Sequence, residues 1–211
     1  MKSIVIAITL VTSLLMNAQK TAVTEVGEEV VLYDNGTWKY VNQGEGDRET
    51  SVNYPMKKFT KDDASSFLLK STKVDIGIWL DPKEWSFQKA TDNAEAEYEF
   101  HLKGEDLYGM LIAERLEIPM ENLKEIALVN GREAAPDLKV IQEEYRMVNG
   151  QKVLFLQLNG TLQGIKFTYY GYYYSSTSGT VQFITYTSQS LLEGYKKDCE
   201  KILNGFVKLP E

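Results

Sequence analysis

The sequence predicts an α+β fold in which a central antiparallel β-sheet is flanked by helices. Apolar residues recur at every second position through most of residues 74–187, and short turns such as Asn149-Gly150 and Gln163-Gly164 join these segments. Two stretches, beginning at Pro119 and at Ser190, instead repeat their apolar residues at helical spacing. Strands that follow one another through short turns, with helices before, within and after them, predict an antiparallel meander.

The N-terminus has the pattern of a secretory signal peptide over residues 1–18. Lys2 precedes an apolar run from Ile4 to Leu15, and Ala18 supplies a small residue at the cleavage position. A membrane-spanning helix needs about 20 apolar residues, and this run is shorter. We therefore expect cleavage after Ala18, no membrane span in the mature chain, and a final location in the periplasm or outside the cell.

Composition limits the classes of partner. The chain of 211 residues is 43% hydrophobic and 25% charged, which suits one globular core. Its formal net charge of −7 argues against a nucleic-acid partner, because nucleic-acid surfaces favour basic proteins. Cys199 is the single cysteine, so no intramolecular disulfide can form and packing must supply the stability.

Residues 19–41 predict a small β-hairpin that precedes the main domain. The segment VVLYDNGTWKYV alternates apolar and polar residues on both sides of Asn35-Gly36, a pair that supplies the positive φ angles of a tight turn. Residues 42–58 are polar and charged, which is typical of a linker. The α+β domain is then predicted over residues 59–211.

The main domain is expected to begin with a short helix over residues 60–70, because Thr60 resembles an N-cap followed by acidic residues. A second helix is predicted from Pro119 to Asn130-Gly131, a pair that often ends helices. The expected strands are residues 74–80, a segment beginning at 85, and residues 95–102, 107–118, 138–147, 152–161, 165–175 and 180–187.

The last segment predicts an amphipathic helix that packs on the sheet. Ser190 and Glu193 match a capping box, in which a hydroxyl and a carboxylate satisfy free backbone N–H groups. Apolar residues from Leu192 to Phe206 then recur at helical spacing. Cys199 falls on this apolar stripe, so we expect a packed side chain rather than a reactive thiol.

Residues 67–209 resemble the PsbP/Mog1-like superfamily. The resemblance is carried by a tryptophan that follows Asp81-Pro82, by two long hairpins, by the segments VNGREAAPD, MVNGQKVLFLQL and GTVQFITYT, and by the closing helix. It implies a sheet flanked by helices and a non-catalytic binding or assembly role, as in many exported bacterial proteins, and it transfers no functional residue. Separately, VVLYDNGTWKYV is similar to a short DGTW hairpin of exported bacterial proteins.

The sequence offers little for catalysis by a histidine or a thiol. His101 is the only histidine, and its strand parity opposes that of Tyr98 and Phe100, so we expect it to face solvent. No serine stands in a G-x-S-x-G turn, and one histidine with one cysteine cannot build a standard zinc site.

Acidic residues are plentiful but have a simpler interpretation. Glu95, Glu97 and Glu99 alternate along one strand and would form a charged outer face, although paired carboxylates can also hydrolyse glycosides in a cleft. Asp92 and Asn93 lie nearby, but the segment lacks the spacing of a calcium-binding loop. The sequence therefore favours a protein without catalytic residues, metal or cofactor.

Residues 168–187, TYYGYYYSSTSGTVQFITYT, concentrate six of the thirteen tyrosines of the chain. A loop centred on Thr177 would pair Gly171 with Phe183 and place Tyr169 and Tyr173 on the core face. Tyr170, Tyr172 and Tyr174 would then share the second face. Three interpretations of that face compete: a helix covers it, β-propensity alone selected tyrosine, or it is an exposed platform for a glycan or a protein partner.

Two functions follow from these observations. The preferred hypothesis is a non-catalytic module of the bacterial envelope that binds a protein partner. The alternative is a carbohydrate- or small-ligand-binding protein that uses the tyrosine-rich hairpin, and a helix over the tyrosine face would remove the main support for a glycan. The candidate binding residues are Tyr170, Tyr172, Tyr174, Gln182 and Tyr186.

Overall fold

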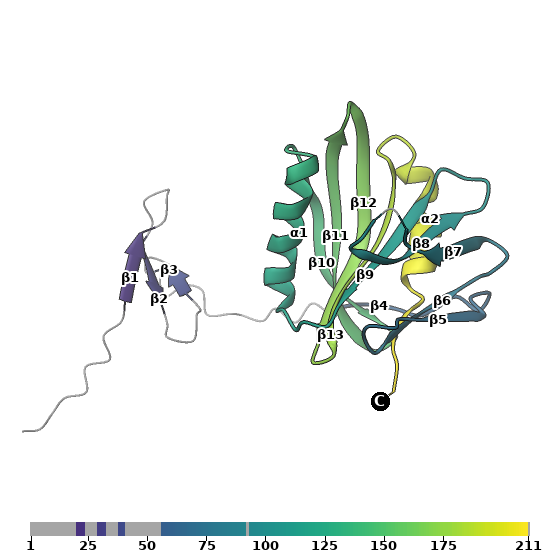
Figure 1. The fold of residues 1–211 in the computed structure, drawn as a ribbon, viewed down its shortest axis with the longest axis horizontal. Coiled ribbons are helices and arrows are strands. Elements are labelled where there is room, and N and C mark those ends of the chain that lie inside the picture. The colour runs from purple at the N-terminus through teal and green to yellow at the C-terminus, as the bar shows by residue number, and fades with distance from the viewer. Residues whose placement is uncertain (1–19, 24–28, 33–37, 41–55, 92, 211) are drawn as a thin grey trace, which may run out of the picture. The chain divides into compact units, whose positions relative to one another are not determined.

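The structure, a computed structural model, describes residues 20–23, 29–32, 38–40, 56–91 and 93–210 (Figure 1). It divides into two compact units, Met1–Asn53 and Tyr54–Glu211. The predicted signal peptide and most of the predicted linker lie outside the described residues.

The first unit contains a three-stranded antiparallel sheet of β1 (Lys20–Val23), β2 (Glu29–Leu32) and β3 (Trp38–Tyr40) in that order. Leu32 pairs with Trp38, which confirms the predicted hairpin, and the sequence did not predict β1. The Asn35-Gly36 turn lies outside the described residues.

The second unit is built on an eight-stranded sheet with the order β4-β10-β11-β12-β13-β9-β8-β7. Neighbouring strands are antiparallel except for β4 and β10. Positive φ angles at Asn149, Gly150, Gln163 and Gly164 confirm the two predicted tight turns. The strands are β4 (Lys57–Phe59), β7 (Trp85–Lys89), β8 (Ala96–Leu102), β9 (Tyr108–Glu114), β10 (Lys139–Val148), β11 (Gln151–Leu162), β12 (Ile165–Ser176) and β13 (Gly179–Ser188).

Each face of this sheet is covered differently. Helix α2 (Leu192–Leu203) and a small sheet of β14 (Phe206–Lys208), β6 (Ile76–Leu80) and β5 (Phe67–Lys70) cover one face and share its hydrophobic core. Helix α1 (Met120–Ala134) packs on the other face over a separate core that includes Leu154, Leu156 and Leu158 (Figure 1). The architecture confirms the predicted α+β class.

The helix predicted over residues 60–70 is wrong, because its acidic residues form a turn instead. Asp62 Oδ1 accepts the backbone N–H of Ala64 at 2.9 Å, and the Asp62 carbonyl accepts the N–H of Ser65 at 3.0 Å. Such local side-chain bonds compete with helix formation. Strand β4 begins inside the predicted linker, and β5 lies within the predicted helix.

Both predicted helix boundaries that depended on capping are also wrong. Helix α2 starts after Leu191 without a side-chain cap, and the hydroxyl of Ser190 lies 3.1 Å from that of Ser188. Helix α1 continues past Gly131 to Ala134. A Cβ atom at Gly131 would lie 2.4 Å from Leu138, so this glycine allows close packing rather than ending the helix.

The hairpin register differs from the prediction by one residue. Ser176 pairs with Gly179, so the turn has two residues, Tyr172 lies opposite Phe183, and Gly171 lies opposite Ile184. Gly179, which directly follows the turn, has a φ of +141°, a conformation that favours glycine. This shift of one residue places each β13 side chain on the face of the sheet opposite to the one predicted for it relative to β12.

We predict that Gly171→Ala destabilises the domain. A Cβ atom there would lie 2.6 Å from the carbonyl oxygen of Phe183 and 2.8 Å from the Cα atom of Ile184, and neither backbone atom can yield easily. Overpacking of this kind costs about 1–3 kcal/mol. Chemical denaturation should show the loss, whereas Gly194→Ala, with open space around its Cβ position in α2, should be neutral or stabilising. Equal stability of Gly171→Ala and the wild type would contradict the close approach.

Candidate functional site

The predicted binding residues divide between the two faces of the sheet. Tyr170, Tyr172 and Tyr174 lie beneath α2 and the small sheet, where they are 4%, 0% and 6% exposed. Gln182 and Tyr186 lie on the α1 face, where they line two different hollows. The interpretation of Tyr170, Tyr172 and Tyr174 as an exposed platform is therefore wrong.

The three tyrosines beneath α2 all have hydrogen-bond partners. The Tyr170 hydroxyl donates to the Glu200 carboxylate, and the Tyr172 hydroxyl donates to Asn204 Oδ1 at 2.8 Å. The Tyr174 hydroxyl donates to Gln151 Oε1 at 3.3 Å. Glu200 lies in α2 and Asn204 directly follows that helix, so the bonds of Tyr170 and Tyr172 hold the helix on the sheet.

Arg146 completes this polar network. Its side chain is 4% exposed, with Nε 2.7 Å from Glu144 Oε1 and Nη1 2.9 Å from Glu200 Oε1. Its guanidinium carbon also lies 3.7 Å from the centre of the Phe155 ring. Burial raises the pKa of Glu144, but hydrogen bonds from Lys57 and Arg146 outweigh burial and leave this pKa below its ordinary value. We interpret the network as structural, because its charges are already paired.

A row of aromatic side chains crosses the α1 face of the sheet. His101, Tyr108, Tyr186 and Tyr169 occupy matching positions on β8, β9, β13 and β12. The His101 and Tyr108 rings stack with centroids 4.8 Å apart, and the Tyr108 and Tyr186 rings stack at 5.6 Å. Tyr169 meets Tyr186 edge to face at 6.1 Å.

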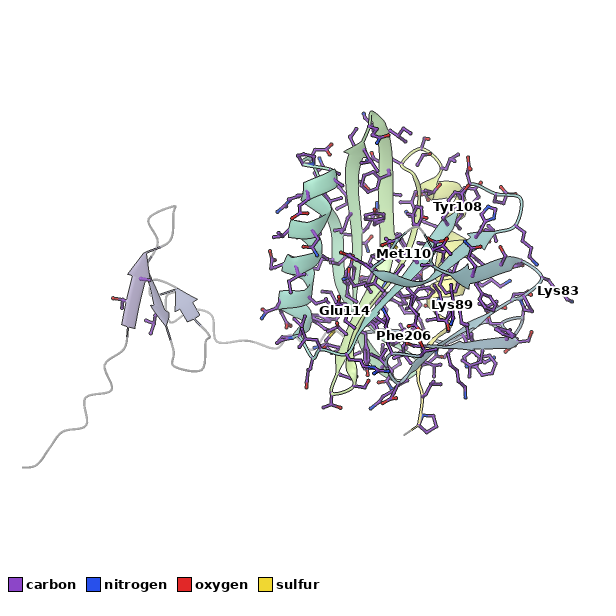
Figure 2. The ribbon with its side chains drawn as sticks, viewed as in Figure 1. Lys83, Lys89, Tyr108, Met110, Glu114 and Phe206 are labelled. Atoms are coloured by element: carbon purple, nitrogen blue, oxygen red, sulfur yellow. The ribbon has the colours of Figure 1, made fainter. Side chains whose placement is uncertain are left out.

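Within this row the Tyr108 ring is stacked on a neighbour at each side. His101 and Tyr186 lie on the two sides of the Tyr108 ring at interplanar angles of 11° and 22°, so both faces of that ring are covered. A sugar would need an open ring face for stacking. Figure 2 shows Tyr108 and Met110 along β9, where the row adjoins the cleft described next.

A cleft of about 200 Å³ lies between α1 and the sheet, beside the aromatic row. Its walls are largely apolar and include Met110, Ile112, Ala127, Leu158 and Ile184. The polar side chains that line it are Asn93, Glu95, Asn130, Gln182 and the tyrosines at 169 and 173. Apolar walls with a few converging polar groups are the usual composition of a ligand site.

Three polar groups of the cleft lack partners among the described residues. Tyr173 is 1% exposed, and burial rather than a hydrogen bond raises the pKa of its hydroxyl. Burial likewise raises the pKa of Tyr169. Within the described part of the chain, neither hydroxyl nor the side-chain amide of Gln182 makes a hydrogen bond, in contrast to the hydroxyls of Tyr170, Tyr172 and Tyr174 on the other face.

The remaining residues considered from the sequence have structural contacts. His101 is half-buried, and its Nε2 lies 2.9 Å from the Glu105 carbonyl oxygen. Glu97 was expected on an outer face, but a bulge between Ala96 and Tyr98 changes its position, and its buried carboxylate accepts the Ser71 hydroxyl and the Thr72 N–H, each at 2.6 Å.

Cys199 is buried as expected, and burial raises the pKa of its thiol to about 11. Across the residues that the structure describes, no group of three or more His, Cys, Asp or Glu side chains is placed to hold a metal ion. The same residues contain no helix that is long and apolar enough to cross a membrane.

The comparison with solved structures establishes the fold. The chain is similar to the cyanobacterial PsbP protein, CyanoP, of Synechocystis sp. PCC 6803, with a TM-score of 0.54 and 15% identity over 70% of this chain and 94% of CyanoP. The domain has the PsbP/Mog1-like fold. At this identity the PsbP likeness concerns the fold alone.

Two further solved structures show weaker likeness. PA94 of Pseudomonas aeruginosa, a protein of unknown function described as a putative regulator, gives a TM-score of 0.45 and 13% identity over 69% of this chain and 98% of PA94. LpqN of Mycobacterium tuberculosis, described as involved in cell envelope biogenesis, gives 0.37 and 10% over 72% of this chain and 82% of LpqN. No protein-family model and no curated protein matches the sequence.

We predict that the two faces respond differently to the loss of a tyrosine hydroxyl. Tyr172→Phe leaves Asn204 Oδ1 without its donor and should lower the free energy of unfolding by about 1–2 kcal/mol. Tyr173→Phe removes a hydroxyl that makes no hydrogen bond within the described residues and should be neutral or stabilising. Denaturant titration of both variants measures the contrast. A loss in Tyr173→Phe as large as that in Tyr172→Phe would mean that the Tyr173 hydroxyl is bonded in the folded protein.

Proposed function

We propose that the protein is a non-catalytic binding module of the bacterial envelope and that it binds a small ligand in the cleft beside α1. The observation that carries the proposal is the combination of concave apolar walls with Tyr169, Tyr173 and Gln182, whose polar groups lack partners within the described residues. Polar groups that line an apolar hollow and make no hydrogen bond within the described residues are free to bond a ligand there.

Export is supported by the sequence pattern of residues 1–18, with Lys2, the apolar run from Ile4 to Leu15 and Ala18. We predict that the full chain expressed in a Gram-negative host is recovered from the periplasmic fraction or the medium as a species that begins at Gln19. Mass spectrometry of the fractionated protein tests this. Retention of residues 1–18 in a cytoplasmic product would contradict export.

A protein partner is the second candidate, and the outer surface of α1 supports it. Ile126 and Val129 are 39% and 59% exposed, and both belong to the helix that forms one wall of the cleft. An apolar pair on the outside of a helix is common on protein surfaces and weaker support than a built cleft. We therefore place small-ligand binding first.

We predict that filling the cleft abolishes ligand binding without unfolding the protein. Ala134 lines the cleft and is exposed, so Ala134→Trp can fill the space at little cost in stability. Glu133→Trp adds the same side chain one residue earlier and serves as the matched control, because Glu133 is exposed and does not line the cleft. Uncharged aromatic and aliphatic fragments should raise the Tm of the wild type and of Glu133→Trp but not that of Ala134→Trp.

A saturating ligand at about one hundred times its Kd stabilises the folded state by about 2.7 kcal/mol, which shifts the Tm measurably. Fragments that stabilise Ala134→Trp as much as the wild type would contradict the cleft as the binding surface.

A further inference from the structure

We infer that the cleft beside α1 takes an uncharged, mainly apolar small molecule that carries a hydrogen-bond acceptor such as a carbonyl oxygen, and that Tyr169, Tyr173 and Gln182 donate to that acceptor. This inference rests on the proposed function, namely that the cleft is a binding surface, and it adds the chemical class of the ligand.

The donors are brought together by strand register. Tyr169 and Tyr173 lie on the same face of β12, and Gly171 between them has no side chain to fill that face. Gln182 is the direct cross-strand partner of Tyr173 on β13. Two hydroxyls and one amide therefore line the same side of the cleft, and each can donate a hydrogen bond.

The protonation state of the tyrosines makes them donors at neutral pH. Burial raises the pKa of both hydroxyls above the ordinary tyrosine value, so both keep their protons. Neither hydroxyl makes a hydrogen bond within the described residues and both tyrosines line the cleft, so each is free to donate to a bound acceptor. A ligand that is purely hydrocarbon has no acceptor and gains no hydrogen bond from these hydroxyls.

The charge of the lining excludes an anionic ligand. No Lys, Arg or His side chain of the described residues lines the cleft, and Glu95 contributes the one ionisable acidic side chain there. A carboxylate or phosphate would lose its hydration to apolar walls without gaining a counter-charge. The acceptor is therefore neutral.

The size of the cleft sets the size of the bound group. Its volume of about 200 Å³ is below the roughly 300–1,000 Å³ of sites that enclose drug-sized molecules. A single ring or a short chain with one polar end fits such a space, and a larger ligand would extend along the neighbouring aromatic row.

Three probes of nearly equal shape test the inference: ethylbenzene without an acceptor, acetophenone with a neutral carbonyl, and benzoate with a negative charge. The purified wild-type protein is titrated with each, and Kd is obtained from NMR chemical-shift changes at residues that line the cleft. We expect acetophenone to bind about 3- to 10-fold more tightly than ethylbenzene, as one neutral hydrogen bond allows. Benzoate should show no saturable binding.

Two variants test whether the preference for acetophenone over ethylbenzene arises in the cleft. Tyr173→Phe should reduce the preference for acetophenone and leave the affinity for ethylbenzene unchanged, because Tyr169 and Gln182 remain as donors. Tyr108→Phe is the matched control, because Tyr108 lies in the aromatic row and does not line the cleft. The preference for acetophenone should persist in Tyr108→Phe, and the NMR spectrum of each variant reports its folding.

The outcomes separate the two proposals. Equal affinities for acetophenone and ethylbenzene in the wild type, or a preference that is undiminished in Tyr173→Phe, would overturn the acceptor inference and leave the cleft as a binding surface. Saturable binding of benzoate in the cleft would overturn the requirement for an uncharged ligand. Absence of shifts at the cleft with all three probes would overturn this inference and the proposed function together.

Discussion

Arg146 lies between the carboxylates of Glu144 and Glu200, and the position of helix α2 depends on that arrangement. The guanidinium is almost fully buried and charged, so it requires paired acceptors, and one of them is supplied by α2. The same Glu200 carboxylate accepts the Tyr170 hydroxyl, and Asn204 at the end of the helix accepts that of Tyr172. Helix α2 and the residue that follows it therefore supply partners to the Tyr170 and Tyr172 hydroxyls on one face of β12.

Side chains alternate along a strand, so Tyr169 and Tyr173 lie on the opposite face of β12 from the three bonded tyrosines. The hydroxyls on that opposite face make no hydrogen bonds within the described residues. Tyr169 and Tyr173 point to the α1 side, where α1 packs over β12 and leaves a cleft toward β9 and β13. No residue of α1, β9 or β13 supplies a partner for their hydroxyls. One tyrosine-rich strand thus contributes three hydrogen-bonded tyrosine hydroxyls on one face and two that lack partners within the described residues on the other. This difference, rather than the number of tyrosines, supports the assignment of a binding surface.

Much of the fold followed from periodicity, whereas the site did not. Alternation located strands β6 to β13, the glycine turns located two hairpins, and the apolar stripe through Cys199 located α2, whereas β14 was not predicted. The predicted register of the last hairpin was wrong because the loop was centred on Thr177, which pairs residue 175 with 179, whereas Gly179 pairs with Ser176. The alternation of side chains along the strand correctly placed Tyr170, Tyr172 and Tyr174 on one face. It cannot predict which face the distant helix α2 covers, because that depends on contacts that Arg146, Glu200 and Asn204 make in the folded protein. An unpartnered hydroxyl at Tyr173 leaves no signal in the sequence.

The most direct test of the contrast between the two faces is the rate at which each tyrosine hydroxyl proton exchanges with water, measured by NMR on tyrosine-labelled protein. The hydroxyl protons of Tyr170 and Tyr172 should exchange slowly, because both are buried and hydrogen-bonded. That of Tyr173 should exchange faster and should slow when acetophenone is added. Slow exchange at Tyr173 in the free protein, unchanged by acetophenone, would mean that its hydroxyl already has a partner and would contradict the account.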